Sequence, residues 1–448
     1  MRGPTGEDHK RQRRILNPSF SPSHLRDILP TFYECVYRLC DAWDEKLAKS
    51  EHEPLAFRDE RHRATWKDDG KSTVIDVYQW ASRVTLDIIG SAGFGHEFSA
   101  VLGNEDKLEQ AAKDMFGEVH VKPTPFKLEM MRIGRLLFEW VPVIRFIPSK
   151  HLQARLAGAA AFRRESQRIL TAKKHEVLQG NADGMFRRRK DLMALLLKST
   201  RHDARMQLSD SELRGQMTTF LLAGHETTSS LLTWTLYRLA TLPEVQSRLR
   251  NEIRNARDKI AQEGRSEFEA DELSALPYLD AVVREAARVD APVPMTIRES
   301  AADDVIPLAT PLRARDGAIR SSLPVKQGQV IFVAVAAYNL DTEVFGEEAD
   351  RFKPERWLSD RVAEGKHTVG AWSPLLTFLA GPRSCIGYRF AILELKALLT
   401  VLIEHYEFAP REQGMTVLSR TVLVSRPVIE GEEHLGCRLP LRVTRVES

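Results

Sequence analysis

The chain has 448 residues, of which 43% are hydrophobic, and its formal net charge at pH 7 is +3. The hydrophobic content is enough for a large buried core, and so small a net charge argues against a nucleic-acid-binding protein. Length alone suggests about three domains, but no repeat or low-complexity linker divides the sequence, so we expect a single large domain.

The first predicted element lies close to the N-terminus. A basic run, Lys10 to Arg14, is followed by the apolar residues Ile15 and Leu16. This pattern predicts a helix on which His9 and Arg13, one turn apart, share a face. Either this basic face is simply solvated, or it holds an anionic group.

A long apolar run at residues 213–240 predicts a buried helix. It contains the sequence Ala-Gly-His-Glu-Thr-Thr, in which Gly224 is expected to leave room for a ligand against the helix. Thr227 can hydrogen-bond a carbonyl one turn back and loosen the backbone there. Glu226 and Thr227 form an acid–alcohol pair suited to relaying protons. The plainer alternative is an ordinary helix in which Glu226 is solvated.

The next predicted helix carries an ion pair. Glu285 and Arg288 are three residues apart, so they lie on one helix face and can pair. Such pairs are common on protein surfaces. A second arginine, Arg356 in the segment 352–357, would complete a bidentate Arg–Glu–Arg network. We expect this network to be structural rather than catalytic.

The remaining sequence predicts few strands, so we expect a mainly α fold with a minor β-sheet. Alternating apolar residues predict strands at 330–336 and 438–446. Polar, basic or Pro- and Gly-bearing stretches predict loops at 187–190, 257–275, 300–328 and 359–371.

The most informative motif is Phe-x-x-Gly-x-Arg-x-Cys-x-Gly, which begins at Phe378. Phe378 supplies an apolar wall, and Gly381 and Gly387 let the backbone turn tightly around Cys385. Backbone N–H groups near the sulfur, with a cation such as Arg383, would favour the thiolate, the form that binds metal. Arg383 is also suited to reach a carboxylate. A lone cysteine is usually a buried core residue, but a match at five fixed positions, the cysteine included, favours a ligand. A helix is predicted next, at 388–406.

Two further observations concern the compartment. No stretch approaches the roughly 18 to 20 apolar residues of a membrane span, and no signal peptide begins the chain. The cysteines have neither disulfide-framework nor zinc-site spacing, which indicates a reducing compartment. They are Cys35, Cys40, Cys385 and Cys437.

In their order along the chain, these segments resemble the cytochrome P-450 superfamily of haem-thiolate monooxygenases, of the eukaryotic microsomal and fungal type. The resemblance spans nearly the whole chain. It implies the P-450 fold, a large helical domain with a minor β-sheet region. It also implies haem b, with Cys385 as the axial ligand of the iron, and a thiolate in that position favours O–O cleavage.

The resemblance further assigns roles to residues. Thr227 and Glu226 would relay protons to dioxygen. The residues expected to bind the haem propionates are His9, where the family often has Trp, with Arg13, Arg298 and Arg383. Other expected haem contacts are Phe378, Gly387, Ala223 and Gly224. The candidate substrate pocket is apolar apart from its threonines, which implies a lipophilic substrate; it comprises Phe220, Ala223, Thr227, Val293, Thr296 and Ile297. The family does not usually have an acid at Asp290, so the cavity wall is expected to differ there.

The partners implied are dioxygen, a lipophilic small molecule and an NADPH–cytochrome reductase, which is a flavoprotein. Nucleic acid is not expected. By resemblance, the full-length protein would associate with the cytosolic face of the endoplasmic reticulum membrane. Residues 1–448 would be one domain that lacks the N-terminal anchor, the first helices and the first strands. Two alternatives stay open: a haem-thiolate isomerase or dehydratase, against which the intact Glu226–Thr227 pair counts, and a truncated non-catalytic remnant.

Overall fold

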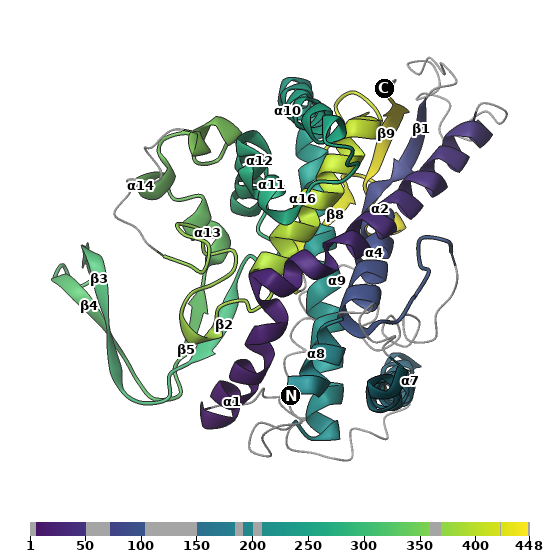
Figure 1. Cartoon of the computed structure of the whole chain (residues 1–448). Coiled ribbons are helices and arrows are strands. Elements are labelled where there is room, and N and C mark those ends of the chain that lie inside the picture. Colours follow the sequence, from purple (N-terminus) through teal and green to yellow (C-terminus); the bar gives the residue numbers. More distant parts are fainter. Residues whose placement is uncertain are drawn as a thin grey trace.

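The computed structural model describes residues 6–50, 72–103, 150–183, 191–199, 208–358, 369–421 and 423–446. Within these ranges the chain is mostly helical (Figure 1). The α-helices are α1 (Gly6–Leu16), α2 (Pro22–Ser50), α4 (Val77–Ile88), α7 (Lys150–Asp183), α8 (Leu192–Ser199), α9 (Asp210–Thr241), α10 (Pro243–Gln262), α11 (Ala270–Ala275), α12 (Pro277–Val289), α13 (Val335–Asn339), α14 (Thr342–Phe345) and α16 (Tyr388–His405). Shorter turns of helix are η1 (Asn17–Phe20), the π-helix η2 (Ile89–Phe94), η6 (Pro354–Trp357), η7 (Gly381–Arg383) and η8 (Glu433–Leu435).

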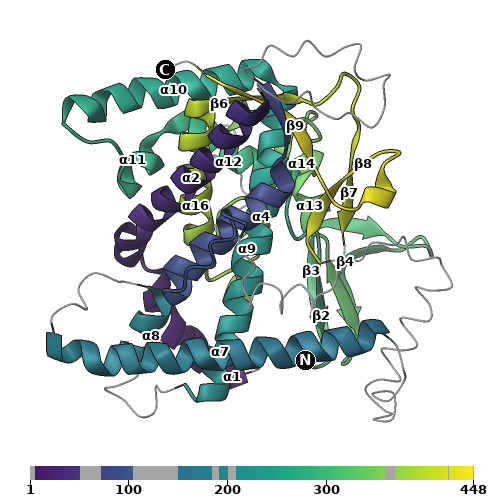
Figure 2. The same cartoon turned by 90° about the vertical axis from the view of Figure 1, so that its right-hand side faces the viewer.

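The strands form small antiparallel sheets. They are β1 (Ser72–Asp76), β2 (Thr296–Glu299), β3 (Asp304–Arg313), β4 (Ile319–Val325), β5 (Val330–Val333), β6 (Tyr406–Pro410), β7 (Val417–Thr421), β8 (Ser425–Ile429) and β9 (Pro440–Arg445). One sheet has the order β1-β9-β6, and the others are the pairs β2–β5, β3–β4 and β7–β8. In Figure 2 these three pairs lie on one side of α9, and the β3–β4 hairpin extends away from the helical body in Figure 1.

The centre of the fold is α9. A reciprocal cap starts this helix, because the Ser209 hydroxyl accepts the N–H of Glu212 (3.2 Å) and the Glu212 carboxylate accepts the N–H of Ser209 (2.8 Å). The helix packs against α4, α7, α12, α16 and β6. Neighbours on several sides explain why the helix is buried without interruption from Thr228 to Leu236. The helix predicted at 213–240 is confirmed, and it begins slightly earlier.

The helix after the cysteine motif, α16, joins that motif to the core. It packs against α2, α9 and α10, and most of its side chains are buried. At its end the hydroxyl of the fully buried Tyr406 shares its single proton between the carbonyl of Cys40 (3.0 Å) and the carboxylate of Asp44 (2.8 Å), both on α2. These contacts fix the C-terminal end of α16, the helix predicted at 388–406, against α2.

Two of the predicted loops are wrong. Residues 300–328 contain the β3–β4 hairpin, whose turn includes Asp316 and Gly317, a common hairpin pair. Its prolines disguised the strands, but proline is tolerated where a strand has no further neighbour. Residues 257–275 contain the end of α10 and all of α11, which a Glu269–Glu272 capping box starts.

Of the two predicted strands, one is shorter than expected and the other is confirmed. At 330–336, the strand β5 ends at Val333 and the helix α13 begins at Val335. At 438–446, β9 confirms the prediction. The expected loop at 187–190 and most of the one at 359–371 lie outside the described residues. None of the described helices is both long enough and apolar enough to cross a bilayer.

Candidate active site

The cysteine motif forms a tight loop between Phe378 and α16. The Cys385 N–H donates to the carbonyl of Phe378 (2.8 Å), which closes the loop. Gly381 has a φ of +70°, which favours glycine. The Phe378 ring lies 5.9 Å from that of Trp372 and 6.0 Å from that of Tyr388, so the apolar wall is packed from both sides. The loop therefore presents Cys385 on a fixed backbone.

The Cys385 side chain is exposed, whereas Cys35 and Cys40 are buried in α2. Burial raises the pKa of each α2 thiol to about 12, so neither can readily form a thiolate. The Cys385 thiol faces open space, but the protein packed around it partly desolvates it and raises its pKa. The Gly387 N–H and the charge of Arg13 oppose this shift. The site thus holds an accessible thiol beside groups that stabilise its thiolate.

The basic helix α1 lies against this loop. Arg13 donates to the carbonyls of Pro382 (3.1 Å) and Ser384 (2.7 Å), so its guanidinium ties α1 to the loop. His9 has a lowered pKa, first because of partial burial and then because of Arg383 and Arg13. The cysteine loop therefore brings together three of the four residues predicted to bind the propionates: His9, Arg13 and Arg383.

The fourth residue predicted to bind a propionate, Arg298, comes from a different element. It lies on β2, where it donates to the Thr296 hydroxyl (2.8 Å) and the Ile297 carbonyl (2.9 Å). Because side chains alternate along a strand, Thr296 and Arg298 share one face of β2 and Ile297 lies on the other. Ile297 pairs across the sheet with Phe332, and both are more than half exposed. Thr296 and Ile297 therefore lie on opposite faces of β2.

The acid–alcohol pair lies midway along α9. The Thr227 hydroxyl donates to the carbonyl of Ala223 (2.6 Å), as its spacing predicts. Ala223 is exposed, whereas Gly224 is not beside open space: a Cβ added there would lie 2.9 Å from two carbon atoms of Ile89 in η2. The glycine lets α9 and η2 pack closely, which differs from the expected room for a ligand. The Glu226 carboxylate accepts a hydrogen bond from Arg426 of β8 (2.8 Å).

The other predicted pocket residues are spread around this region. Phe220 is buried, and its ring meets the Phe20 ring edge-on at 5.6 Å. The same Phe20 ring is the nearest neighbour of Gly387, 3.5 Å from the Cβ that a side chain would add there. Phe220 therefore packs beneath the cysteine loop as a core residue. Val293, in the turn before β2, is partly exposed.

Behind the loop, Glu285 is the centre of a buried network. Arg288 donates to it through Nε (2.9 Å) and Nη2 (2.8 Å), and both side chains are 0% exposed. Arg356 of η6 donates through Nε (2.9 Å). Two donors that the sequence did not reveal complete it: the N–H of Lys353 (2.7 Å) and the indole of Trp357 (2.8 Å). This network joins α12 to the segment before the cysteine loop.

Asp290, the unusual acid, is part of an interhelical contact. Its carboxylate accepts two hydrogen bonds from Arg238 of α9, from Nε and Nη2, each 2.8 Å long. The Asp290 side chain is 10% exposed. These two hydrogen bonds join the end of α12 to the end of α9. Asp290 thus has a structural role, which differs from the expected effect on the cavity wall.

Sequence reasoning missed the contribution of the β7–β8 hairpin. Its end is fixed to α9, because the Ser230 hydroxyl donates to the Ser425 carbonyl (2.6 Å). It is also fixed to the segment before β2, because the Ser425 N–H donates to the Pro292 carbonyl (2.8 Å). Leu423 in the turn is 71% exposed. Residues 417–421 and 425–429 do not alternate between apolar and polar types, so the sequence carries no strand signal here and no sign of the helix that the hairpin packs against.

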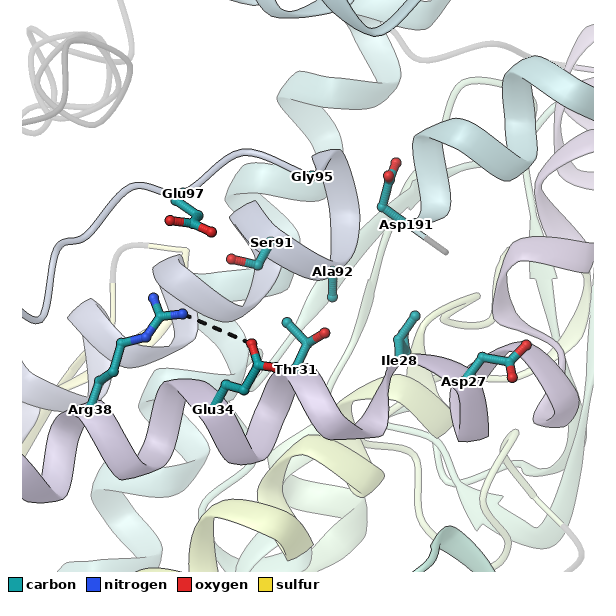
Figure 3. A pocket seen from close by; sticks show the side chains of 10 residues that line it. All are labelled: Asp27, Ile28, Thr31, Glu34, Arg38, Ser91, Ala92, Gly95, Glu97 and Asp191. Carbon is teal, nitrogen blue, oxygen red and sulfur yellow. Dashed lines mark ion pairs between the residues drawn. The ribbon is translucent and has the colours of Figure 1, made fainter. Parts of the chain in front are cut away.

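A separate polar cavity of ≈ 280 Å³ lies between α2 and η2 (Figure 3). It is lined by the acids Asp27, Glu34, Glu97 and Asp191, with Arg38 and five further residues. Asp191 is already paired with the buried Lys173 of α7. None of the lining residues belongs to α9 or to the cysteine loop, so this cavity is distinct from the candidate active site.

Comparison with known proteins gives a consistent result. Residues 4–428 match the family model described as Cytochrome P450. Cytochrome P450 monooxygenase 205 of Postia placenta is 37% identical over 446 residues, which cover 98% of this chain and 76% of the relative. Cytochrome P450 monooxygenase claP of Ampulloclitocybe clavipes is 34% identical over 459 residues, covering 99% and 76%.

Among solved structures, the crystal structure of a cytochrome P450, CYP102L1, is similar to this chain with a TM-score of 0.70. The likeness covers 99% of this chain and 83% of that one, at 21% sequence identity. At that identity the comparison shows the fold alone, and it confirms the predicted mainly α architecture with small sheets.

Proposed function

The chain belongs to the cytochrome P450 family and is a cytochrome P450 monooxygenase, and on this premise we propose that it oxygenates a lipophilic organic molecule through haem held by Cys385. The observation that carries the proposal is the cysteine loop. It presents an exposed thiol on a closed backbone turn, with the Gly387 N–H and Arg13 beside it. The fungal source of the relatives supports a eukaryotic enzyme of this class.

The residues present fit a haem group. A soft, accessible sulfur is a suitable iron ligand, and a metal deprotonates a coordinating thiol even where burial raises its pKa. Arg13, Arg383 and His9 lie together at one side of the loop, where they are suited to hold propionates. When bound, thiolate-ligated haem supplies the activation of dioxygen. The overall reaction consumes dioxygen, two electrons and two protons, and yields the oxygenated product and water.

Thr227 and Glu226 are proposed as the groups that hold and move these protons. The Thr227 hydroxyl proton is engaged by the Ala223 carbonyl at 2.6 Å, so its oxygen can accept a hydrogen bond from the cavity side. A carboxylate one residue earlier on the same helix is a suitable proton carrier. Ala223, on the exposed side of α9, leaves space beside them for dioxygen and substrate.

We infer that the electrons come from an NADPH–cytochrome reductase at the cytosolic face of the endoplasmic reticulum membrane. Support comes from α1, which lies against the cysteine loop and exposes Lys10 and Arg14 to solvent. A cationic face close to the cofactor suits an acidic flavoprotein, because complementary charges steer association. A lipophilic substrate is proposed because two accessible pocket candidates, the exposed Ala223 and the partly exposed Val293, are apolar.

A spectrum tests the proposal directly. The purified protein, reduced and exposed to carbon monoxide, should show the strongly red-shifted Soret band of thiolate-ligated haem. Cys385→Ser should abolish this band with helical content unchanged, and the matched variant Cys437→Ser should keep it. If Cys385→Ser retained the band, the ligand assignment would be wrong. A screen of lipophilic compounds for spin-state shifts would then identify the substrate class.

A further inference from the structure

The acid of the acid–alcohol pair is held by an ion pair with a residue 200 positions away. Arg426 Nη2 lies 2.8 Å from Glu226 Oε1, and the two side chains are 23% and 24% exposed. This contact was not foreseen from the sequence. It matters because a carboxylate that carries protons is useful only if it points toward the group it supplies.

The protein fixes Arg426 by its backbone as well as by its charge. The neighbouring residue, Ser425, accepts a hydrogen bond from the Ser230 hydroxyl (2.6 Å) and donates its N–H to Pro292 (2.8 Å). Ser230 lies four residues after Glu226, so it occupies the next turn of α9 on the same face. The strand β8 is therefore docked one helical turn from the carboxylate, and the guanidinium has a short path to it.

The surroundings favour a charged pair. Arg420 of β7 stands directly opposite Arg426 in the ladder, which places a second positive charge on the same face of the hairpin. Tyr78 of α4 and Cys437 are the other titratable groups that act on Arg426. Arg426 has a raised pKa, since Tyr78 and Glu226 outweigh the effect of its partial burial. The guanidinium therefore remains protonated at any pH at which the enzyme works.

One oxygen of the carboxylate remains available. Oε1 is bonded to Arg426, whereas Oε2 has no donor among the described residues. With Oε1 fixed, the carboxylate cannot rotate freely, and Oε2 is the oxygen left to take a proton from water. The ion pair thus separates the two oxygens into one that anchors and one that exchanges.

We propose that Arg426 is the positioning residue of the proton relay: it anchors Glu226 through Oε1, so that Oε2 accepts protons from solvent and passes them toward Thr227. This inference rests on the proposed monooxygenase function. Arg426 does not touch the reacting atoms, and its effect acts through the direction of one carboxylate.

The test compares three variants with the wild-type holoenzyme. Arg426→Gln removes the charge, Arg426→Lys restores it, and Arg411→Gln is a matched control, since Arg411 forms an ion pair with Glu432 in the same C-terminal region. With 7-ethoxycoumarin as a lipophilic probe, product and hydrogen peroxide are measured per NADPH oxidised. Arg426→Gln should lower the product yield about tenfold and release peroxide instead. Arg426→Lys should recover most of the yield, and Arg411→Gln should match wild type.

Two further measurements separate positioning from a general structural role. Turnover driven by added hydrogen peroxide, which brings its own protons, should be within about twofold of wild type in Arg426→Gln. In thermal unfolding, Glu226→Gln and Arg426→Gln should be non-additive, with the second substitution costing much less once the first is present. If Arg426→Gln loads haem poorly, yields of product and peroxide per mole of bound haem keep the test decisive, because the diversion to peroxide should still appear in the loaded fraction.

The possible failures are distinguishable. Absence of the red-shifted carbonyl band in wild type would overturn the proposed function itself. If that band is present and NADPH-driven yield is equal in wild type and Arg426→Gln, the inference about Arg426 is wrong while the function stands. Equal losses in Arg426→Lys and Arg426→Gln, or peroxide-driven turnover lost in parallel, would likewise overturn it.

Discussion

Removing the Glu285 carboxylate should cost far more stability than removing any surface acid. Glu285 accepts two hydrogen bonds from Arg288 and one each from Lys353, Arg356 and Trp357, five in all. At about 1.5–3 kcal/mol for each bond to a charged group, the sum would exceed the whole stability of many proteins. The cost is smaller than this sum, because both arginines keep backbone carbonyl acceptors, including those of Asn339 and Phe345.

The relevant magnitude is that of breaking a buried pair, about 3–5 kcal/mol, because Arg288 is left charged and buried without its counter-ion. That corresponds to a fall of about 150- to 4,000-fold in the ratio of folded to unfolded protein. Glu285→Ala should therefore shift the urea midpoint markedly and reduce haem loading, whereas Glu285→Gln, which keeps part of the hydrogen bonding, should fall between.

The assay is urea unfolding followed by circular dichroism, with haem content measured in parallel. The control is Glu348→Ala, which removes a surface acid paired with Arg351 and Lys353 in the same segment. Exposed pairs of this kind contribute about 0–1 kcal/mol. If Glu285→Ala unfolds within about 1 kcal/mol of wild type, the network does not stabilise the fold as its geometry indicates.

Three other outcomes are expected. Thr227→Ala should keep haem and substrate binding but release more peroxide per NADPH oxidised, and unchanged yields would remove Thr227 from the proton relay. Glu394 is fully buried, and this burial raises the pKa of its carboxyl well above 4.5. The protonated carboxyl therefore stabilises the folded state fully below pH 4.5, and this stabilisation is lost as the pH rises through the raised pKa. Melting temperatures should therefore fall less steeply with rising pH in Glu394→Gln, and identical slopes would contradict the buried acid. Reversing the charges of Lys10 and Arg14 should slow reduction more at low salt than at high salt, as stopped-flow kinetics would show; an effect independent of salt would mean that these residues act through haem binding.

Local patterns predicted the elements that are strongly periodic or carry a motif. The run at 213–240 and the stretch after Cys385 are helices because each is apolar over several turns and has neighbours on several sides. The pairing of Glu285 with Arg288 follows from i, i+3 spacing alone. These features depend on residues close together in the sequence, which is why one sequence was enough to find them.

Contacts between distant segments could not be predicted in the same way. Nothing in the sequence near Glu226 indicates Arg426, and nothing near Asp290 indicates Arg238; each pair is made by the way two elements pack. The β3–β4 hairpin was missed because its prolines and exposed residues resemble a loop, although the Asp-Gly turn was visible. Gly224 was expected to leave room for a ligand, but Ile89 packs against it. The sequence of a helix does not show which neighbouring element covers each of its faces.

The close packing at Gly224 limits how this enzyme can diversify. An added methyl group would lie 2.9 Å from two side-chain carbons of Ile89, so a substitution there requires either the Ile89 side chain or α9 itself to shift. A shift of α9 would also displace Thr227, less than one turn further along the helix. Ala223 is exposed on the other side and can change size without disturbing that packing. Two adjacent positions therefore respond differently to a larger side chain: a change at Gly224 acts on the packing of two helices, and a change at Ala223 acts on the space beside Thr227.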